Sequence, residues 1–251
     1  MSLAKEYSNQ STWRNWNSYL KELRIENSDT IFDFGCSIGT VTKLFAQKAS
    51  QVIGVDNNPE LLQFAIDSNY DNNILYQLSD LGSIENLGLP IADGIWTSFT
   101  AAYFPNFTPV LNNWLTVLKP NGWIAIVEMS GLYAHKPLSK FTSETFTKYY
   151  KRQRRKNMYD FEMGSCIKDF LINAGLSVEY EEDKQDKELT FCGPAEPEIL
   201  KAWECRFNRM FKFREYVGED VFRKIKEEFL NCLSNENHIS DTIVKFIIAK
   251  K

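Results

Sequence analysis

The chain has 251 residues, of which 43% are hydrophobic and 25% are charged, and its formal net charge is −4 at pH 7. These values are typical of a soluble globular domain with a full core, and they give no general attraction to nucleic acid or to an anionic membrane. Five cysteines without a C-x-x-C pair predict neither a disulfide framework nor a metal site, and the polar start and short apolar runs predict a cytoplasmic protein without a membrane span.

The first predicted element is an amphipathic helix within residues 8–25. Its apolar residues recur every three or four positions, at Trp13, Trp16, Leu20 and Leu23. Serine and threonine residues before this stripe can cap the helix. We expect this N-terminal cap helix either to close over a bound ligand or to pack on an edge of the sheet.

A strand, a glycine turn, a helix and a second strand are predicted within residues 31–56. The apolar run 31–34 ends at Gly35, Gly39 completes a tight turn, and apolar residues at helical spacing follow. Residues 52–55 form the next strand, with Asp56 at its carboxyl end. Because a right-handed crossover joins parallel strands, both strand ends should lie on one edge of a sheet.

The charges beside this turn indicate which ligand the edge binds. A dinucleotide site favours the spacing G-x-G-x-x-G, whereas Ser37 stands here where a second glycine would help. Asp33, two residues before the turn, would repel a phosphate and attract a cation. A ligand with an ammonium or sulfonium group at the turn and a ribose near Asp56 fits better, and S-adenosylmethionine is such a ligand.

Further strands are predicted at residues 74–78, 95–99, 123–127, 176–180 and 243–249, with helices between them. The order of motifs over roughly residues 30–130 resembles the class I S-adenosylmethionine-dependent methyltransferases, in particular the small-molecule type 11 domain. In that family an acid precedes the first glycine, as Asp33 does, and a second acid binds the ribose hydroxyls, as Asp56 would. The step 79–81 is similar to the adenine-binding step. Ser37 and Asn121 are departures, since the family often has glycine at both places.

The resemblance implies a set of cofactor contacts along the carboxyl edge of the sheet. They are Asp33, Gly35, Cys36, Ser37, Gly39, Asp56, Asn57, Asp80, Leu81, Ser98, Phe99 and Thr100.

Three side chains near the same edge are candidates for a general base. Glu128 follows the fifth strand, His135 lies shortly after it, and Tyr103 follows the fourth strand. A solvated acid at a strand end and a structural histidine are the alternatives for the first two. The segment 98–104 lacks the proline pair that methyltransferases of nucleic-acid base amines commonly carry there, so we do not expect that activity.

Two helical insertions are predicted, at residues 130–164 and 193–217. In the resembled family the first commonly forms a substrate lid, and here it contains a basic segment, 148–156. An arginine-rich lid can bind a carboxylate or a phosphate, although a solvated helix face is the alternative for such a run. The candidate substrate-binding residues are Arg152, Arg155, Tyr149 and Trp203.

We therefore predict one α/β domain, residues 1–251, with a doubly wound, mostly parallel seven-stranded sheet of the Rossmann-like methyltransferase type. The predicted activity is methyl transfer from S-adenosylmethionine to a small-molecule acceptor, possibly acidic, with S-adenosylhomocysteine as the product. The alternatives are a nucleic-acid or protein methyltransferase that uses the basic lid, a nicotinamide-dependent oxidoreductase, and a non-catalytic cofactor-binding protein. A nucleic-acid partner is not expected, and the sequence does not give the oligomeric state.

Overall fold

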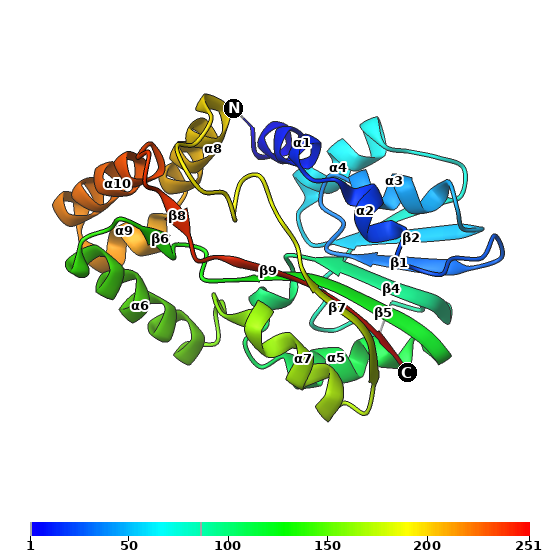
Figure 1. Ribbon diagram of the computed structural model, residues 1–251. Helices are drawn as coiled ribbons and strands as arrows, with labels where there is room; N and C mark the ends of the chain where they lie inside the picture. The colour runs from blue at the N-terminus through cyan, green and yellow to red at the C-terminus, as the bar shows by residue number, and fades with distance from the viewer. Residues whose placement is uncertain (1, 86) are drawn as a thin grey trace.

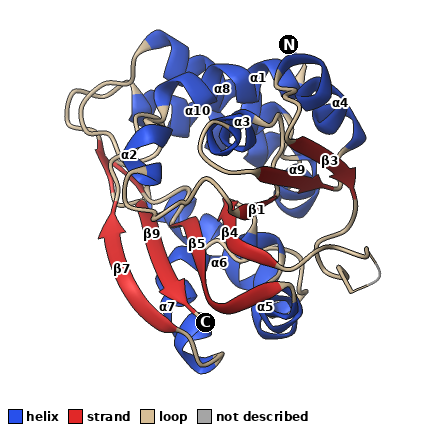
Figure 2. Cartoon of the chain, turned by 90° about the vertical axis from the view of Figure 1, so that its right-hand side faces the viewer, coloured by secondary structure: helices blue, strands red, loops and turns tan. Residues whose placement is uncertain are grey.

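A seven-stranded sheet is the centre of the fold in the computed structural model, which describes residues 2–85 and 87–251 (Figure 1). Its strand order is β3-β2-β1-β4-β5-β9-β7. The strands are β1 (Thr30–Phe34), β2 (Gln51–Asp56), β3 (Ile74–Leu78), β4 (Ala92–Ser98), β5 (Leu118–Ser130), β7 (Ser177–Asp183) and β9 (Ile243–Lys250). The first five strands pair in parallel, and β9 pairs antiparallel with β5 and β7. The predicted fold class is confirmed, with β3 and β7 at the two edges of the sheet (Figure 2).

Helices cover both faces of the sheet, which explains why its inner strands are mainly apolar. On one face lie α3 (Thr40–Ala46), α4 (Pro59–Ser68) and the short α2 (Trp16–Leu20), and on the other lie α5 (Phe107–Thr116) and α7 (Met163–Asn173) (Figure 1). Two hydrophobic cores result, one around Trp96 and Phe45 and the other around Phe34 and Trp114. All four of these side chains are fully buried.

The helix predicted within residues 8–25 is two helices in the structure. The first, α1 (Leu3–Trp13), begins at Ser2, whose hydroxyl accepts from the Lys5 amide. It ends at Arg14, which has an extended backbone and bonds the carboxylates of Asp186 and Glu188. A new helix then starts at Trp16, so the apolar stripe continues across a break that its spacing does not reveal.

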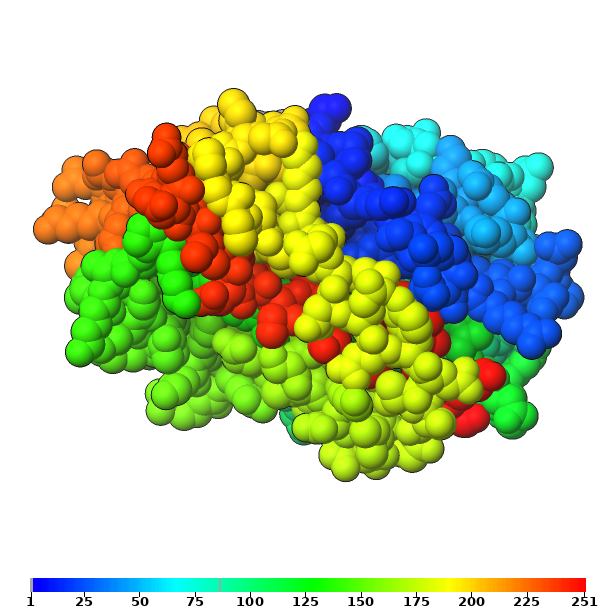
Figure 3. Space-filling model, viewed as in Figure 1, coloured from blue at the N-terminus to red at the C-terminus, as the bar shows by residue number. Residues whose placement is uncertain are grey.

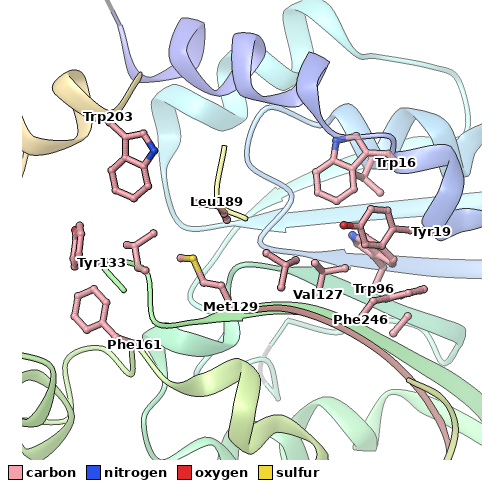
Figure 4. Packing of buried hydrophobic residues seen from close by; sticks show 14 of the residues in the cluster. Trp16, Tyr19, Trp96, Val127, Met129, Tyr133, Phe161, Leu189, Trp203 and Phe246 are labelled. Carbon is pink, nitrogen blue, oxygen red and sulfur yellow. The ribbon is translucent and has the colours of Figure 1, made fainter. Parts of the chain in front are cut away.

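A cap of helices faces the carboxyl ends of the parallel strands (Figure 1). It consists of α6 (Lys140–Arg155), α8 (Pro197–Asn208), α9 (Phe211–Val217) and α10 (Glu219–Leu233), with a two-stranded sheet formed by β6 (His135–Lys136) and β8 (Ile239–Ser240). The two predicted insertions thus supply α6, α8 and α9. Aromatic side chains join the cap to the main core, with Leu189 and Met129 between the cap aromatics and those over the sheet (Figure 4). None of the described helices has the length and apolar character needed to cross a bilayer.

Candidate active site

A cavity of about 810 Å³ lies between the carboxyl ends of the strands and the cap. Its floor comes from the ends of β1, β2 and β4, and α1 closes one side through Leu3, Tyr7 and Gln10. On the outer surface, residues near 185–205 lie against this N-terminal helix (Figure 3, yellow against blue). The cavity is lined by every residue predicted to contact the cofactor except Gly39. Binding by those residues stays a prediction, but the fold has brought eleven of the twelve to one place.

The turn after β1 is shaped by backbone hydrogen bonds and by close packing. The amides of Gly35 and Cys36 both donate to the Val55 carbonyl, at 2.8 and 3.2 Å. Gly35 has a φ of +79°, and a Cβ atom there would lie 2.0 Å from Oγ1 of Thr100. Only glycine fits both this conformation and this space. The turn therefore approaches the segment after β4 closely and leaves room in the cavity beside it.

Asp56 links the second strand to the glycine turn. Its Oδ2 accepts from the Ser37 amide at 2.8 Å, and its Oδ1 accepts from the Asn58 amide at 2.8 Å. Burial raises the pKa of this carboxyl, whereas these amide bonds lower it. A carboxylate oxygen has lone pairs beyond the one each amide uses, so Asp56 can still accept from ligand hydroxyl groups.

Asp33 is a buried acid on the floor of the cavity. Its side chain is 2% exposed, and its Oδ2 accepts from the Thr42 hydroxyl at 2.6 Å. Burial raises the pKa of Asp33 to about 7, despite the bond from Thr42. A cationic group bound beside it would favour the ionised form. No cationic side chain within residues 2–85 and 87–251 forms an ion pair with Asp33, so this acid is available to a cationic group of a ligand.

The wall opposite the glycine turn is aromatic and carries arginines. We call it the cap wall, and it consists of Tyr7, Tyr133, Tyr159, Phe161, Arg206, Arg209 and Met210. Arg14 and Tyr103 line the cavity as well. The sequence pattern did not single out Arg206 and Arg209. Their only signal was the apolar stripe over 200–214, which is also what ordinary core packing produces.

Comparisons with known proteins agree with this geometry. A family model described as Methyltransferase domain matches residues 32–126, the segment from β1 into β5. Solved structures with the same fold include a candidate methyltransferase from Bacillus halodurans (TM-score 0.65, 16% identity, 94% of this chain and 98% of that chain covered). Another is an S-adenosylmethionine-dependent methyltransferase from Mesorhizobium loti (TM-score 0.54, 15% identity, 94% and 97% covered). Residues 32–126 of this chain are a class I S-adenosylmethionine-dependent methyltransferase domain.

The family, the enzyme class and the cofactor predicted from the sequence are thereby confirmed. A third solved structure is phosphoethanolamine N-methyltransferase 2 of Haemonchus contortus in complex with S-adenosyl-L-methionine (TM-score 0.59, 20% identity, 94% of this chain and 52% of that chain covered). No curated protein sequence matches the chain. The backbone at the two departures explains why the family often has glycine there, because Ser37 and Asn121 have φ values of 51° and 63°. Glycine adopts this left-handed conformation most readily.

Glu128, a predicted general base, lies outside the cavity in which an acceptor would bind. Glu128 is fully buried and does not line the cavity. Its two oxygens accept from the amides of Ala102 and Met129, at 3.1 and 3.0 Å. Burial raises the pKa of Glu128 to about 7. The acid holds the 3-10 turn η1 (Ala101–Tyr103) against β5, so its contacts support a positioning role and not proton transfer with an acceptor.

His135 does not line the cavity either. It is 2% exposed, and its Nδ1 lies 2.8 Å from Nε2 of His238. His135 is on β6, and His238 directly precedes β8. Burial, together with the neighbouring histidine, lowers the pKa of His135 to about 3. Tyr103 does line the cavity and makes an edge contact with Tyr159, with ring centroids 4.9 Å apart. Tyr103 is 59% exposed, but protein atoms around its hydroxyl group partly desolvate it and raise its pKa to about 12, so the phenol stays protonated at neutral pH.

None of the four predicted substrate-binding residues lines the cavity. Tyr149 and Trp203 are buried among aromatic side chains, and the Trp203 indole donates to the Glu188 carbonyl at 3.2 Å. The guanidinium of Arg152 lies 5.2 Å from the ring centroid of Tyr216, and Arg155 is exposed. The predicted lid helix forms as α6. Its aromatic side chains Phe146 and Tyr149 are buried in the core of the cap, and its arginines do not line the cavity.

Proposed function

We propose that this methyltransferase transfers the methyl group of S-adenosylmethionine to a small-molecule acceptor held between the glycine turn and the cap wall. One observation carries the proposal: a single cavity extends from Asp33 and Asp56 to Arg206 and Tyr133. Cofactor and acceptor can therefore share one enclosed space. Known enzymes with this fold act on different acceptors, so the fold alone does not select one.

The residues on the floor fit the chemical groups of the cofactor. Asp33 offers a buried carboxylate for the ammonium group, and Asp56 offers acceptor lone pairs for the ribose hydroxyls. Asp80, the predicted adenine contact, lines the same cavity. When bound, the cofactor supplies an electrophilic methyl group. The protein then contributes mainly orientation of the acceptor and exclusion of water.

The cavity offers no strong base to the acceptor. Among the described residues that line it, the carboxylates are Asp33, Asp56 and Asp80, all on the floor, and no histidine or glutamate is present. The phenol of Tyr103 is already protonated at neutral pH, because its pKa is raised to about 12, so it cannot act as the base. We infer that the acceptor presents a nucleophile that is already free of its proton, such as a carboxylate or an unprotonated amine.

The proposal is tested by two measurements on the full chain. Titration with S-adenosylhomocysteine should show binding, and NAD should not compete. Incubation with methyl-labelled S-adenosylmethionine and fractionated small-molecule extracts should then move label into a small-molecule fraction. Transfer only to RNA or protein, lost when Arg152 and Arg155 are neutralised, would instead favour the nucleic-acid or protein alternative. No binding of S-adenosylhomocysteine would overturn the proposal. The cytoplasmic location stays a prediction.

A further inference from the structure

Two arginines of the cavity wall have their counter-charges outside the cavity. Nε of Arg14 lies 2.7 Å from Oδ2 of Asp186, and its Nη2 lies 3.1 Å from Oε2 of Glu188. The other oxygen of Glu188 bonds Arg206. Both arginines line the cavity, whereas the two carboxylates do not and are 4% and 0% exposed. The guanidinium groups therefore stand between the cavity and their own anions.

Arg206 is held in one orientation and keeps one buried donor, Nε, without a partner among the described residues. Its Nη2 bonds Glu188, and its guanidinium carbon lies 4.7 Å from the ring centroid of Trp203. Trp203 stands above Tyr133 and Phe161 at the cap end of the aromatic core (Figure 4). Nε of Arg206 is buried and has no hydrogen-bond partner within residues 2–85 and 87–251. An unpaired buried donor is unfavourable, and a charged donor bonds most strongly to an anion.

The tyrosines around Arg206 are suited to donate to the same ligand. Tyr7, Tyr133 and Tyr159 all lie close enough to Arg206 to interact with its charge. Burial raises the pKa of each phenol, so their hydroxyl groups stay protonated and remain hydrogen-bond donors. Tyr7 interacts electrostatically with Asp56 on the floor as well as with Arg206. Tyr7 is therefore the residue of the cap wall that is near both the predicted ribose contact and Arg206.

Arg209, the third arginine that lines the cavity, is also paired with a carboxylate outside the cavity. Arg209 bonds Glu6, which is 5% exposed and does not line the cavity. No carboxylate of the described residues lines the cap wall itself. A cationic group at this wall would face guanidinium groups, whereas a carboxylate or phosphate would find donors on several sides.

We propose that the cap wall is a recognition site for an anionic group of the acceptor, a carboxylate or a phosphate, with Arg206 as its principal contact and the Tyr7 and Tyr159 hydroxyls as further donors. This inference rests on the proposed function, since it assigns the class of the acceptor in the same cavity. Arg206 acts here as a specificity residue. The exposed arginines of α6 have no part in it.

The test is a ligand-observed NMR titration of the full chain, saturated with S-adenosylhomocysteine, using benzoate, phenyl phosphate and neutral benzamide as probes. We expect at least one of the two anions to bind about tenfold or more tightly than benzamide. The stronger anion distinguishes a carboxylate site from a phosphate site. Arg206→Lys keeps a positive charge beside Glu188 but loses the Nε donor, and it should weaken binding of that anion about tenfold while leaving benzamide unchanged. Arg152→Lys, outside the cavity, is the matched control and should change nothing.

Several results would overturn the inference. In the wild-type protein, these results are equal binding of benzamide and both anions, or no binding of any probe up to about 10 mM, a concentration at which fragments of this size still bind a built site. In the variants, they are an unchanged anion affinity of Arg206→Lys, or an equal loss of anion affinity in Arg152→Lys. The same titrations without S-adenosylhomocysteine test the cap wall alone. Failure of S-adenosylhomocysteine to bind would thus count against the proposed function. The anion site would be tested separately, by the titrations without S-adenosylhomocysteine.

Discussion

Replacing Asp33 by asparagine should stabilise the protein and weaken its cofactor binding at the same time. The carboxyl is 2% exposed, and burial raises its pKa from 3.8 to about 7. A group whose pKa is raised in the folded state contributes stability that is complete below pH 3.8 and is lost as the pH rises to about 7. Above pH 7 the folded protein must therefore bear the cost of an ionised, buried acid.

The size of this cost follows from the difference of about 3 pH units between 3.8 and 7. At 1.36 kcal/mol per unit, the upper limit is about 4 kcal/mol. Asparagine has nearly the same shape, is neutral at every pH, and can still accept the bond from Thr42. We expect Asp33→Asn to raise the free energy of unfolding at pH 8 by about 2 to 4 kcal/mol, with the difference shrinking towards pH 4.

The assay is urea unfolding of both proteins between pH 4 and pH 8, without cofactor. Asp93→Asn is the control: burial alone would raise the pKa of Asp93, but the bonds from Lys119 and the Thr30 amide lower it. That variant should lose stability at pH 8. Calorimetric titration should show weaker binding of S-adenosylhomocysteine by Asp33→Asn, by about 1 to 3 kcal/mol for a lost bond between charged groups. A variant that is no more stable than wild type at pH 8 would refute the burial argument, and unchanged affinity would remove Asp33 from the cofactor site.

Three further predictions concern the same cavity. Asp56→Ala should weaken S-adenosylhomocysteine binding by about 1 to 3 kcal/mol in calorimetry, and an unaltered affinity would exclude it as a contact. Gly35→Ala should lower the melting temperature more than Gly175→Ala, because both glycines have φ near +80° but only at Gly35 would the new Cβ meet Thr100; equal losses would contradict the packing argument. Tyr103→Phe should leave the shape of the pH–rate profile unchanged once an acceptor is identified, because the phenol, with a pKa of about 12, transfers no proton near neutral pH; a shifted profile would restore it as a base.

The floor of the site was predictable from the sequence because its geometry is local. A strand, a glycine turn and a helix place Asp33 and Gly35 within a few residues of each other, and Asp56 ends the next strand. Parallel strands with right-handed crossovers then leave little freedom in where these residues lie. All seven predicted strands form. The five inner strands are mainly apolar and buried, whereas the edge strands β3 and β7 are largely exposed.

Positions just beyond a strand end were less predictable. Glu128 does lie at the end of a strand, yet both of its oxygens are taken by the amides of Ala102 and Met129, and the side chain points into protein. His135 pairs with His238, 103 residues further along the chain. Neither contact can be predicted from the spacing of neighbouring residues, since each depends on which distant segment packs there.

The sequence by itself determined the sheet, the glycine turn and the acids that follow the strands, because short-range sterics and a period of two or 3.6 residues carry that information. Only the tertiary structure decided the cap wall. Arg206 belongs to an aromatic stripe that looks like ordinary core, and it faces a cavity only because Glu188 and Trp203 fix its guanidinium and α1 brings Tyr7 beside it. Burial and charge pairing between segments some 200 residues apart are properties of the packed molecule, which no local pattern records.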